Sequence, residues 1–310
     1  MLGISASKQI NFKQIKLFNQ TKLGKDKTVK FCTFLAGGSP NVGLKTDGGI
    51  INITALGFPS SMNEVIGGGE EMLANISDAA KDKALPALSE ESLQFLPVTE
   101  PGKIICTGLN FREHAAETGK EVPDHPVFFT KFGDSLSAHG GAVALPPWLD
   151  TFDHEAELVI VAGKAAYNIS REEAKSHIFG YTCGNDLSAR RAQGATSQWL
   201  CGKALPGFAP VGPYVVTGDS FDPLEHHGIF CDLNGVRAQS GTTTDMIFDC
   251  YEIVSIASRY FPLSPGDLIF TGTPPGVIQG RKKEERKWLK PGDVVDITID
   301  GIGTLTTNLV

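Results

Sequence analysis

Short apolar runs separated by turn residues make up the chain from Val29 to Leu56. The runs FCTFLAGG, NVGLKTDGG and IINITAL are punctuated by glycine, proline and asparagine, which is typical of short strands joined by turns. Ser61 and Glu64 then have capping-box spacing, and helix-forming residues continue through EEMLANISDAAKD until the stretch around Pro86. The pattern predicts a small N-terminal α/β module.

Beyond residue 100 the apolar runs stay short, and few helices separate them. The runs that predict strands are VFFTK, ELVIVA, GPYVVT, IFCDL, LIFT and VVDITI. Asn234-Gly235 and Asp300-Gly301 are dipeptides favoured in two-residue hairpin turns, so antiparallel pairing is expected in the C-terminal part. The fold class predicted for the whole chain is β-rich α+β.

Two helices are predicted within this β-rich part. Ser170 and Glu173 form a second capping-box pattern, which predicts a helix from Ser170 to Phe179. A second helix is predicted from Met246 to Phe261 and is stopped by Pro262. Its apolar residues recur at steps of three and four, so one face is expected to pack against the sheet.

A linker is predicted at LPVTEPGK, from Leu96 to Lys103, because two prolines and a glycine interrupt the periodicity. The domain boundary is therefore placed near Glu100. This divides the chain into an N-terminal extension (1–28), a small N-terminal domain (29–100) and a larger domain that carries the candidate chemistry (101–310).

Composition excludes several classes of protein. The net charge of -7, with no basic cluster beyond the short RKKEERK run, argues against nucleic-acid binding. No apolar stretch approaches the roughly 20 residues that span a bilayer, so no membrane association is expected. The six cysteines lie far apart without C-x-x-C spacing or a secretory leader, and they indicate reduced thiols in a cytoplasmic protein.

The segment FDHEAEL carries a pair of carboxylates, Glu155 and Glu157, and Asp186 follows in YTCGNDLSAR. Residues two apart on a strand point to the same face, so Glu155 and Glu157 would lie together beside a buried apolar run. Unpaired buried carboxylates are costly, and three oxygen ligands suit Mg²⁺ or Mn²⁺ better than zinc. The alternative is that one glutamate faces solvent and the other pairs with a lysine or arginine.

Two further patterns carry candidate chemistry. His114 and Glu117 are three residues apart, so on a helix the carboxylate could orient the imidazole, although an ordinary surface pair has the same spacing. Lys203 lies in the apolar stretch CGKALPGFAP, where a near-buried ammonium needs an anionic partner. A lysine whose stem is buried and whose charge reaches solvent is the alternative.

Six segments in register resemble the fumarylacetoacetate hydrolase family, over roughly Lys103 to Val310. They are GLNFREHAAE, the run ending in PVFFTK, HEAEL, GNDLSARRAQ, GKALPGFAPVGP and PGDLIFTGTPPGV. The resemblance implies a mixed β-roll catalytic domain that is usually a homodimer. It also implies action on short 2-oxo or 1,3-dicarbonyl acids with Mg²⁺ or Mn²⁺.

The same resemblance implies roles for individual residues. Glu155, Glu157 and Asp186 would hold the metal. Within the segment from Arg112 to His125, read as a mobile helical lid, His114 oriented by Glu117 would activate water.

Further roles follow for the other motifs. Lys203 would pair with the metal-bound carboxylates or stabilise the enolate that develops when the C–C bond breaks. The implied substrate contacts are Arg190, Gln193, Thr271, Gly272 and Thr273, and a plain β-turn is the alternative reading of the last three.

Two departures from the family pattern bear on the substrate. Pro206 replaces an aspartate that many members have three residues after the lysine, and Arg191 replaces an acid in the usual ARDLQ. Both changes are expected to remove negative charge beside the pocket. A more anionic or larger acid could therefore be accepted.

The leading functional hypothesis is a metal-dependent hydrolase that cleaves a carbon–carbon bond in an acylpyruvate-like acid and releases pyruvate and a carboxylic acid. The alternative on the same scaffold is an oxaloacetate tautomerase or decarboxylase, or a ureidoglycolate-type lyase, because the His114–Glu117 pair could also shuttle protons. A third hypothesis is a protein that binds a small acid without catalysis.

Overall fold

The computed structural model describes residues 28–81 and 85–310, so the predicted extension (1–28) lies almost wholly outside the described residues. The helices are α1 (Met62–Gly67), α2 (Gly69–Ala79), α3 (Arg112–Glu117), α4 (Arg171–Ala174), α5 (Arg190–Gln193), α6 (Leu200–Lys203) and α7 (Cys250–Tyr260).

The strands in the described part of the chain are β1 (Lys30–Ala36), β2 (Ser39–Thr46), β3 (Gly49–Asn52), β4 (Ala87–Leu88), β5 (Gln94–Phe95), β6 (Ile104–Gly108), β7 (Val127–Lys131), β8 (Leu136–Ala138), β9 (Ala142–Val143), β10 (Phe152–Asp153), β11 (Ala156–Ala162), β12 (Ile178–Asn185), β13 (Ser188–Ala189), β14 (Ala209–Thr217), β15 (Gly228–Leu233), β16 (Val236–Thr242), β17 (Leu268–Phe270), β18 (Val294–Ile299) and β19 (Gly303–Leu309).

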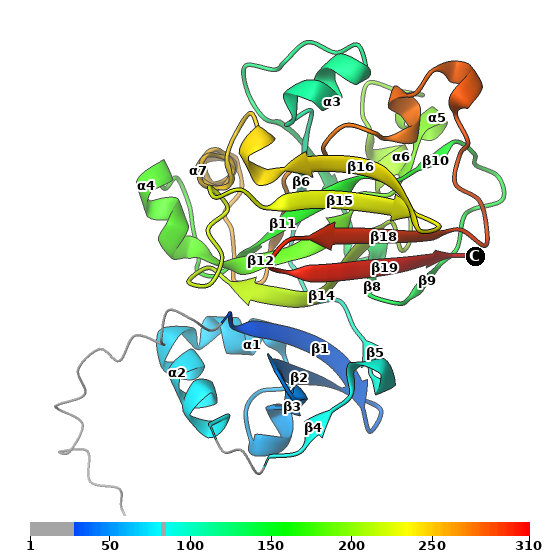
Figure 1. Cartoon of the computed structure of the whole chain (residues 1–310). Helices are drawn as coiled ribbons and strands as arrows, with labels where there is room; N and C mark the ends of the chain where they lie inside the picture. The colour runs from blue at the N-terminus through cyan, green and yellow to red at the C-terminus, as the bar shows by residue number, and fades with distance from the viewer. Residues whose placement is uncertain (1–27, 82–84) are drawn as a thin grey trace, which may run out of the picture.

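These strands form two main sheets in the described residues, and the predicted β-rich α+β class is confirmed. A twelve-stranded sheet has the order β4-β3-β2-β1-β14-β12-β11-β17-β6-β7, with β5 paired to β1 and β8 to β14. A five-stranded sheet has the order β16-β15-β18-β19-β9, and β10 pairs with β13. Figure 1 shows β15, β16, β18 and β19 side by side, with β11 and β12 behind them.

The strand β11 is buried along its whole length because apolar clusters cover both of its faces. Leu158 and Ile160 point into a large core that includes residues of the five-stranded sheet and α7. Val159 and Val161 point into a second core shared with the N-terminal strands and α1. The alternation of side chains along a strand explains this division, and it also fixes which way the glutamate at the start of β11 faces.

The N-terminal strands continue the sheet of the rest of the chain. β1 pairs antiparallel with β14, with Phe31 opposite Val215, and Figure 1 shows this module below the other strands with α1 and α2 beside it. The domain boundary near Glu100 stays a prediction. None of the helices in the described residues is both long and apolar enough to cross a membrane.

Some of the turns and helix caps that the sequence predicted are present, and one cap is not. Asn234-Gly235 joins β15 to β16 as the predicted two-residue turn, whereas β18 and β19 are joined by three residues, Asp300 to Ile302; the predicted antiparallel pairing is confirmed in both hairpins. The capping box of Ser170 with Glu173 is present, but the Ser61 side chain makes no capping hydrogen bond.

The predicted helix bounds need correction at three places. The helix from Ser170 gives way to a 3₁₀ turn and then, at Ile178, to β12, because the apolar residues there pair within the sheet. The helix α7 begins four residues later than predicted, where Asp249 accepts hydrogen bonds from the first-turn amides. The helix α3 ends at Glu117, and Gly119 follows with a φ of 66°.

Candidate active site

Three carboxylates meet where β11 begins and β12 ends. Glu155 and Glu157 flank the first residue of β11, and Asp186 follows the last residue of β12. The pairing of these strands brings the ends together, and the Asp186 amide donates to the Glu155 carbonyl at 3.0 Å. Each residue offers an oxygen within 4.8 Å of the other two, and all three residues are buried. The predicted proximity of the two glutamates is thus observed in the fold.

Basic side chains neutralise two of these carboxylates. The Lys203 Nζ lies 2.7 Å from Glu155 Oε2 and 2.5 Å from Asp186 Oδ2. Lys131 Nζ lies 2.7 Å from Asp186 Oδ1, and Arg190 Nη1 lies 2.7 Å from Glu155 Oε1. Lys203 is 1% exposed, so it is an enclosed counter-ion and its charge does not reach solvent.

Glu157 differs from its two neighbours because no lysine or arginine of the described residues pairs with it. Its Oε2 accepts a hydrogen bond from the Gly272 amide at 2.7 Å. Burial and the charges of Asp186 and Glu155 hold the pKa of Glu157 well above its usual range. At Glu155, burial opposes ionisation, but Lys203 and Arg190 outweigh it and lower the pKa. The cluster therefore lacks positive charge at Glu157.

The donor set fits a hard divalent cation. Three buried carboxylates without a histidine or cysteine among them offer oxygen ligands only, as Mg²⁺ and Mn²⁺ prefer. A cation beside Glu157 would lower its raised pKa, because the positive charge would favour the carboxylate against burial and against the two neighbouring negative charges. Glu155, Glu157 and Asp186 would hold such an ion.

His114 lines the same cavity as Glu155 and Glu157 and is buried, whereas its partner Glu117 is half-buried. His114 is 6% exposed, and its Nδ1 lies 2.8 Å from Glu117 Oε1. The other carboxylate oxygen of Glu117 accepts from the Gly276 amide at 2.9 Å. A carboxylate can only accept, so Nδ1 carries the proton in this contact and Nε2 is left as the basic nitrogen. The pair is therefore an oriented dyad, unlike an ordinary surface pair.

The other predicted site residues fall into two groups. Arg190 and Gln193 lie on α5, where Arg190 Nη1 donates to Gln193 Oε1 at 3.1 Å, and both line the cavity described below. Thr271 and Thr273 use their hydroxyls to donate to backbone carbonyls of β11, so these hydroxyls anchor the loop. Gly272 presents its amide to Glu157.

Glu155 and Glu157 of the cluster, His114 of the dyad and residues of α5 line a cavity of about 170 Å³. Its walls also include Thr107, Phe129, Trp199 and Gln279, which the sequence did not single out. Pockets for drug-sized ligands occupy roughly 300–1,000 Å³, so this cavity suits a much smaller molecule.

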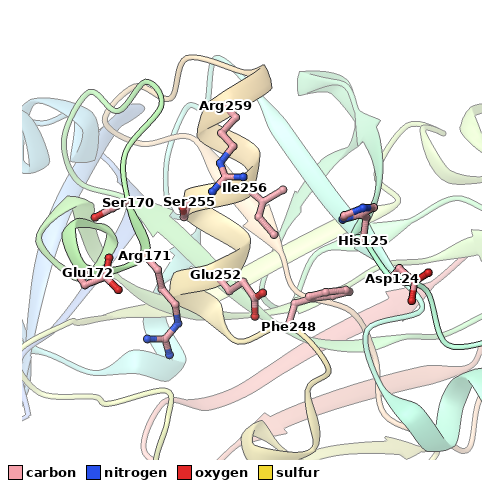
Figure 2. Close-up of a pocket in the computed structure, with 10 residues that line it drawn as sticks. All are labelled: Asp124, His125, Ser170, Arg171, Glu172, Phe248, Glu252, Ser255, Ile256 and Arg259. Atoms are coloured by element: carbon pink, nitrogen blue, oxygen red, sulfur yellow. The ribbon is translucent and has the colours of Figure 1, made fainter.

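A larger groove of about 490 Å³ lies elsewhere, between α4, α7 and the segment that carries Asp124 and His125. Figure 2 shows that charged side chains of both signs, including Arg171, Glu252 and Arg259, project from its walls. It shares no lining residue with the smaller cavity. We place the candidate active site at the smaller cavity because Glu155, Glu157 and His114 line it.

The two departures from the family pattern do not face the cavity, so the expected loss of negative charge beside the pocket is wrong. Arg191 is exposed and its Nη2 pairs with Asp150 at 2.6 Å. Successive helical residues point about 100° apart, which places Arg190 inside and Arg191 outside. Pro206 is also exposed and does not line the cavity.

Sequence reasoning missed three buried polar residues that support the site. Lys131, within the strand pattern VFFTK, reaches Asp186 and also donates to the backbone carbonyl of Phe208 at 2.8 Å. Asn110, which shortly precedes α3, donates to the backbone carbonyls of Phe248 and Thr271 and accepts from the Phe248 amide. For Lys131, the available signal was a charged side chain at the end of an apolar strand pattern.

The third missed residue is Asp153, which is fully buried beside Arg190. Its Oδ2 accepts from Arg190 Nε at 2.9 Å and from the Gln279 amide at 3.0 Å, and its Oδ1 accepts from the amides of His154 and Ile278. Burial opposes its ionisation, but Arg190 and these amides lower the pKa below the usual value. Asp153 therefore fixes the arginine that faces Glu155.

Asp153→Asn is expected to lower the free energy of unfolding by about 3–5 kcal/mol, because the new amide would place donors against donors and remove a buried partner of Arg190. Chemical denaturation near neutral pH measures this. Asp150→Asn, at an exposed ion pair, is the matched control and should change stability by less than about 1 kcal/mol. Equal effects of the two substitutions would contradict the supporting role of Asp153.

The depressed pKa gives the effect a pH dependence. The ionised form of Asp153 is favoured by folding, so its contribution is present above the unfolded-state pKa and is lost as pH falls through the folded-state pKa. The difference between Asp153→Asn and the wild type should shrink in acid.

A β-rich fold that encloses carboxylates, lysines and a histidine dyad around a small cavity defines an enzyme that acts on small molecules. The chain belongs to the fumarylacetoacetate hydrolase family, because the model for the Fumarylacetoacetate (FAA) hydrolase C-terminal region matches residues 103–310. The resemblance seen in the sequence is confirmed.

Known proteins similar to this chain include enzymes with different reactions. Human "Oxaloacetate tautomerase FAHD2A, mitochondrial" is 37% identical over 278 residues, which cover 87% of this chain and 88% of that protein. The structure of a fumarylacetoacetate hydrolase from Exiguobacterium antarcticum has a TM-score of 0.79 at 32% identity and covers 91% of this chain and 99% of that one. Maleylpyruvate hydrolase from Sphingobium sp. SYK-6 has a TM-score of 0.74 at 28% identity, with coverage of 91% and 99%.

These relatives leave two expectations untested. The human relative is described as mitochondrial, so the cytoplasmic location of this chain stays a prediction. The homodimer also stays a prediction.

Proposed function

We propose that this protein is a divalent-metal-dependent tautomerase that interconverts the keto and enol forms of oxaloacetate. The observation that carries the proposal is the oriented His114–Glu117 dyad beside three buried carboxylates in a cavity of about 170 Å³. The identity of 37% to an oxaloacetate tautomerase over most of both chains supports this substrate in preference to a larger acid.

The proposed reaction moves one proton. A divalent cation held by Glu155, Glu157 and Asp186 would polarise the carbonyl of a 2-oxo acid. His114 Nε2 takes a proton from C3, the electron pair of that C–H bond forms the C2–C3 double bond, and the π pair of the C2 carbonyl moves to its oxygen. The resulting imidazolium, held by Glu117, returns the proton to the oxygen on C2, so the enol forms with no net gain or loss of atoms.

Two buried cations assist this proton transfer. Lys203 is buried and lines the cavity, so its ammonium group could stabilise negative charge that develops on the oxygen. Arg190 has one buried guanidinium nitrogen, Nη2, without a hydrogen-bond partner among the described residues. A substrate carboxylate would satisfy it.

Hydrolysis of an acylpyruvate is the second candidate. The same dyad could activate water, and the likeness to maleylpyruvate hydrolase supports this reaction class. Both candidates use the same residues, so products must distinguish them.

The deciding assay follows the decay of enol oxaloacetate and, separately, pyruvate release from acetylpyruvate and fumarylpyruvate. Each substrate is tested with Mg²⁺, Mn²⁺ or EDTA. Metal-dependent acceleration of oxaloacetate ketonisation without pyruvate release supports the tautomerase. Pyruvate release from an acylpyruvate alone would overturn it in favour of the hydrolase.

Metal addition is expected to stabilise the protein against unfolding. A ligand that binds only the folded state at a hundredfold excess over its Kd adds about 2.7 kcal/mol. Thermal melts with Mn²⁺, with Mg²⁺ and with EDTA measure this effect. The EDTA-treated protein is the baseline. An unchanged Tm with both metals would contradict a metal site in the folded protein.

A further inference from the structure

Gln239 is a buried glutamine on an edge strand, and the proposed reaction gives it no role. The strand β16 is otherwise mostly exposed or half-buried, whereas Gln239 is 1% exposed. A buried amide must satisfy two donor and two acceptor positions, and Gln239 satisfies all four. Its partners lie on two different parts of the active site.

The acceptor end of Gln239 holds the strand that carries the carboxylates. Its Oε1 accepts from His154 Nδ1 at 2.9 Å and from the Ala156 amide at 3.0 Å. Ala156 lies between Glu155 and Glu157, so this bond fixes the backbone from which both side chains project. A shift of this backbone would move both carboxylates together.

The donor end of Gln239 holds the loop that supports the dyad. Its Nε2 donates to Thr273 Oγ1 at 2.8 Å and to the Pro274 carbonyl at 2.8 Å. Two residues further on, the Gly276 amide donates to Glu117, which in turn orients His114.

The loop lies in close contact with β16 at Gly276. A Cβ on Gly276, which has a φ of 106°, would lie 2.2 Å from the Ala238 carbonyl oxygen. The loop therefore cannot shift toward β16. Its distance from the carboxylate strand is set by the contacts of Gln239 together with the Thr271 and Thr273 hydroxyls, which donate to carbonyls of β11.

We propose that Gln239 is a positioning residue that fixes the separation between the carboxylate cluster and the His114–Glu117 dyad. The Gln239 amide bonds both to the strand that carries Glu155 and Glu157 and to the loop that bonds to Glu117. Its position therefore helps to set where His114 lies relative to a substrate bound at the carboxylates. The inference rests on the proposed function only for its kinetic test.

Gln239→Glu is the sharpest variant because it preserves size and both acceptor contacts. The new carboxylate oxygen would face the Pro274 carbonyl, where two acceptors repel, and the loop is expected to move away with Glu117. A misplacement of about 1 Å can cost about a hundredfold in rate, so kcat should fall by about tenfold to a hundredfold. The Mn²⁺ dissociation constant should change by less than about threefold.

Acid should partly restore this variant. A protonated carboxyl group can donate to the Pro274 carbonyl as the amide does, so kcat relative to the wild type should rise as pH falls. Gln94→Glu makes the same chemical change at an exposed position of β5 and is the matched control, with kcat expected to stay unchanged. Protonation would also stabilise a variant that the buried charge merely destabilises, so kcat is expressed per folded molecule at each pH.

The ¹⁵N chemical shifts of the His114 ring give a readout that does not depend on turnover. They report which ring nitrogen carries the proton, and the wild type is expected to show protonated Nδ1. In Gln239→Glu the shifts should move toward a mixture of tautomers. If the wild type failed to act on oxaloacetate, the proposed function would be wrong. The His114 shifts would still test the role of Gln239, because they do not depend on turnover.

Wild-type kcat per folded molecule together with unchanged His114 shifts would overturn the proposal. A proportional loss of Mn²⁺ binding and kcat in Gln239→Glu would also overturn it, since Gln239 would then act only on the strand that carries Glu155 and Glu157. If Gln239→Glu does not fold, Gln239→Met, which removes all four hydrogen bonds without burying a charge, is tested by kcat per folded molecule and by the His114 shifts. Wild-type kcat and shifts in that variant would overturn the proposal as well.

Discussion

Glu157→Gln is expected to lower kcat/KM by more than about a thousandfold while leaving the metal-free protein at least as stable as the wild type. The loss of about 4 kcal/mol of transition-state stabilisation corresponds to this factor, and removal of a metal ligand is of that order. The glutamine keeps an oxygen for the Gly272 amide. It also removes a buried carboxyl group that burial and the charges of Asp186 and Glu155 disfavour as an anion.

The matched comparison is Glu155→Gln, two residues away. Glu155 is the partner of Arg190 and Lys203, so its neutralisation leaves both cations short of negative charge and should cost about 3–5 kcal/mol of stability. Activity, Mn²⁺ titration and denaturation of the EDTA-treated variants separate the two effects. A strongly destabilised Glu157→Gln, or one with wild-type activity, would contradict the assignment of Glu157 as the ligand without a cationic partner.

His114→Ala is expected to lower kcat by about a hundredfold to ten-thousandfold while the Mn²⁺ dissociation constant stays within about threefold of the wild type. General acid–base groups contribute rate factors of this size, and His114 contacts Glu117 and is not one of the three clustered carboxylates. Steady-state kinetics with Mn²⁺ titration of the same preparation measures both quantities.

His226→Ala is a suitable control because this histidine is exposed and lies outside the cavity. Glu117→Gln should have a smaller effect than His114→Ala, since the dyad would lose orientation and retain its base. If His114→Ala kept the full rate of enolisation, the base would be another group. Loss of Mn²⁺ binding in this variant would place His114 in the metal site.

Many local features of this protein were accessible from the sequence because they depend on neighbouring residues. The spacing of Glu155 and Glu157 predicted a shared face, and the dipeptide Asn234-Gly235 predicted a hairpin turn, which the structure contains. The residues Ser170 and Glu173 form the capping box that their spacing predicts. Each of these signals acts over two to four positions, where strand alternation, turn conformation and capping are decided.

Signals that compete with tertiary pairing were less reliable. The segment after His177 has helix-compatible residues, yet Ile178 and Phe179 join β12 because the sheet offers them partners on both sides. Arg191 was expected beside the pocket, but the rotation between successive helical residues turns it to solvent and turns Arg190 inward. Propensity is a weak guide where burial against distant strands decides the outcome.

The sequence by itself determined the local chemistry: a pair of carboxylates on one face, a histidine that a glutamate can orient, and the turns that end the strands. Only the tertiary structure decided which charges compensate one another, because Lys131, Arg190 and Lys203 reach the carboxylates from separate elements. It also decided that Gln239 joins the two halves of the site. The physical reason is that desolvation, ion pairing and buried hydrogen bonds depend on distances between residues far apart in the chain, and these distances exist only once the sheets have packed.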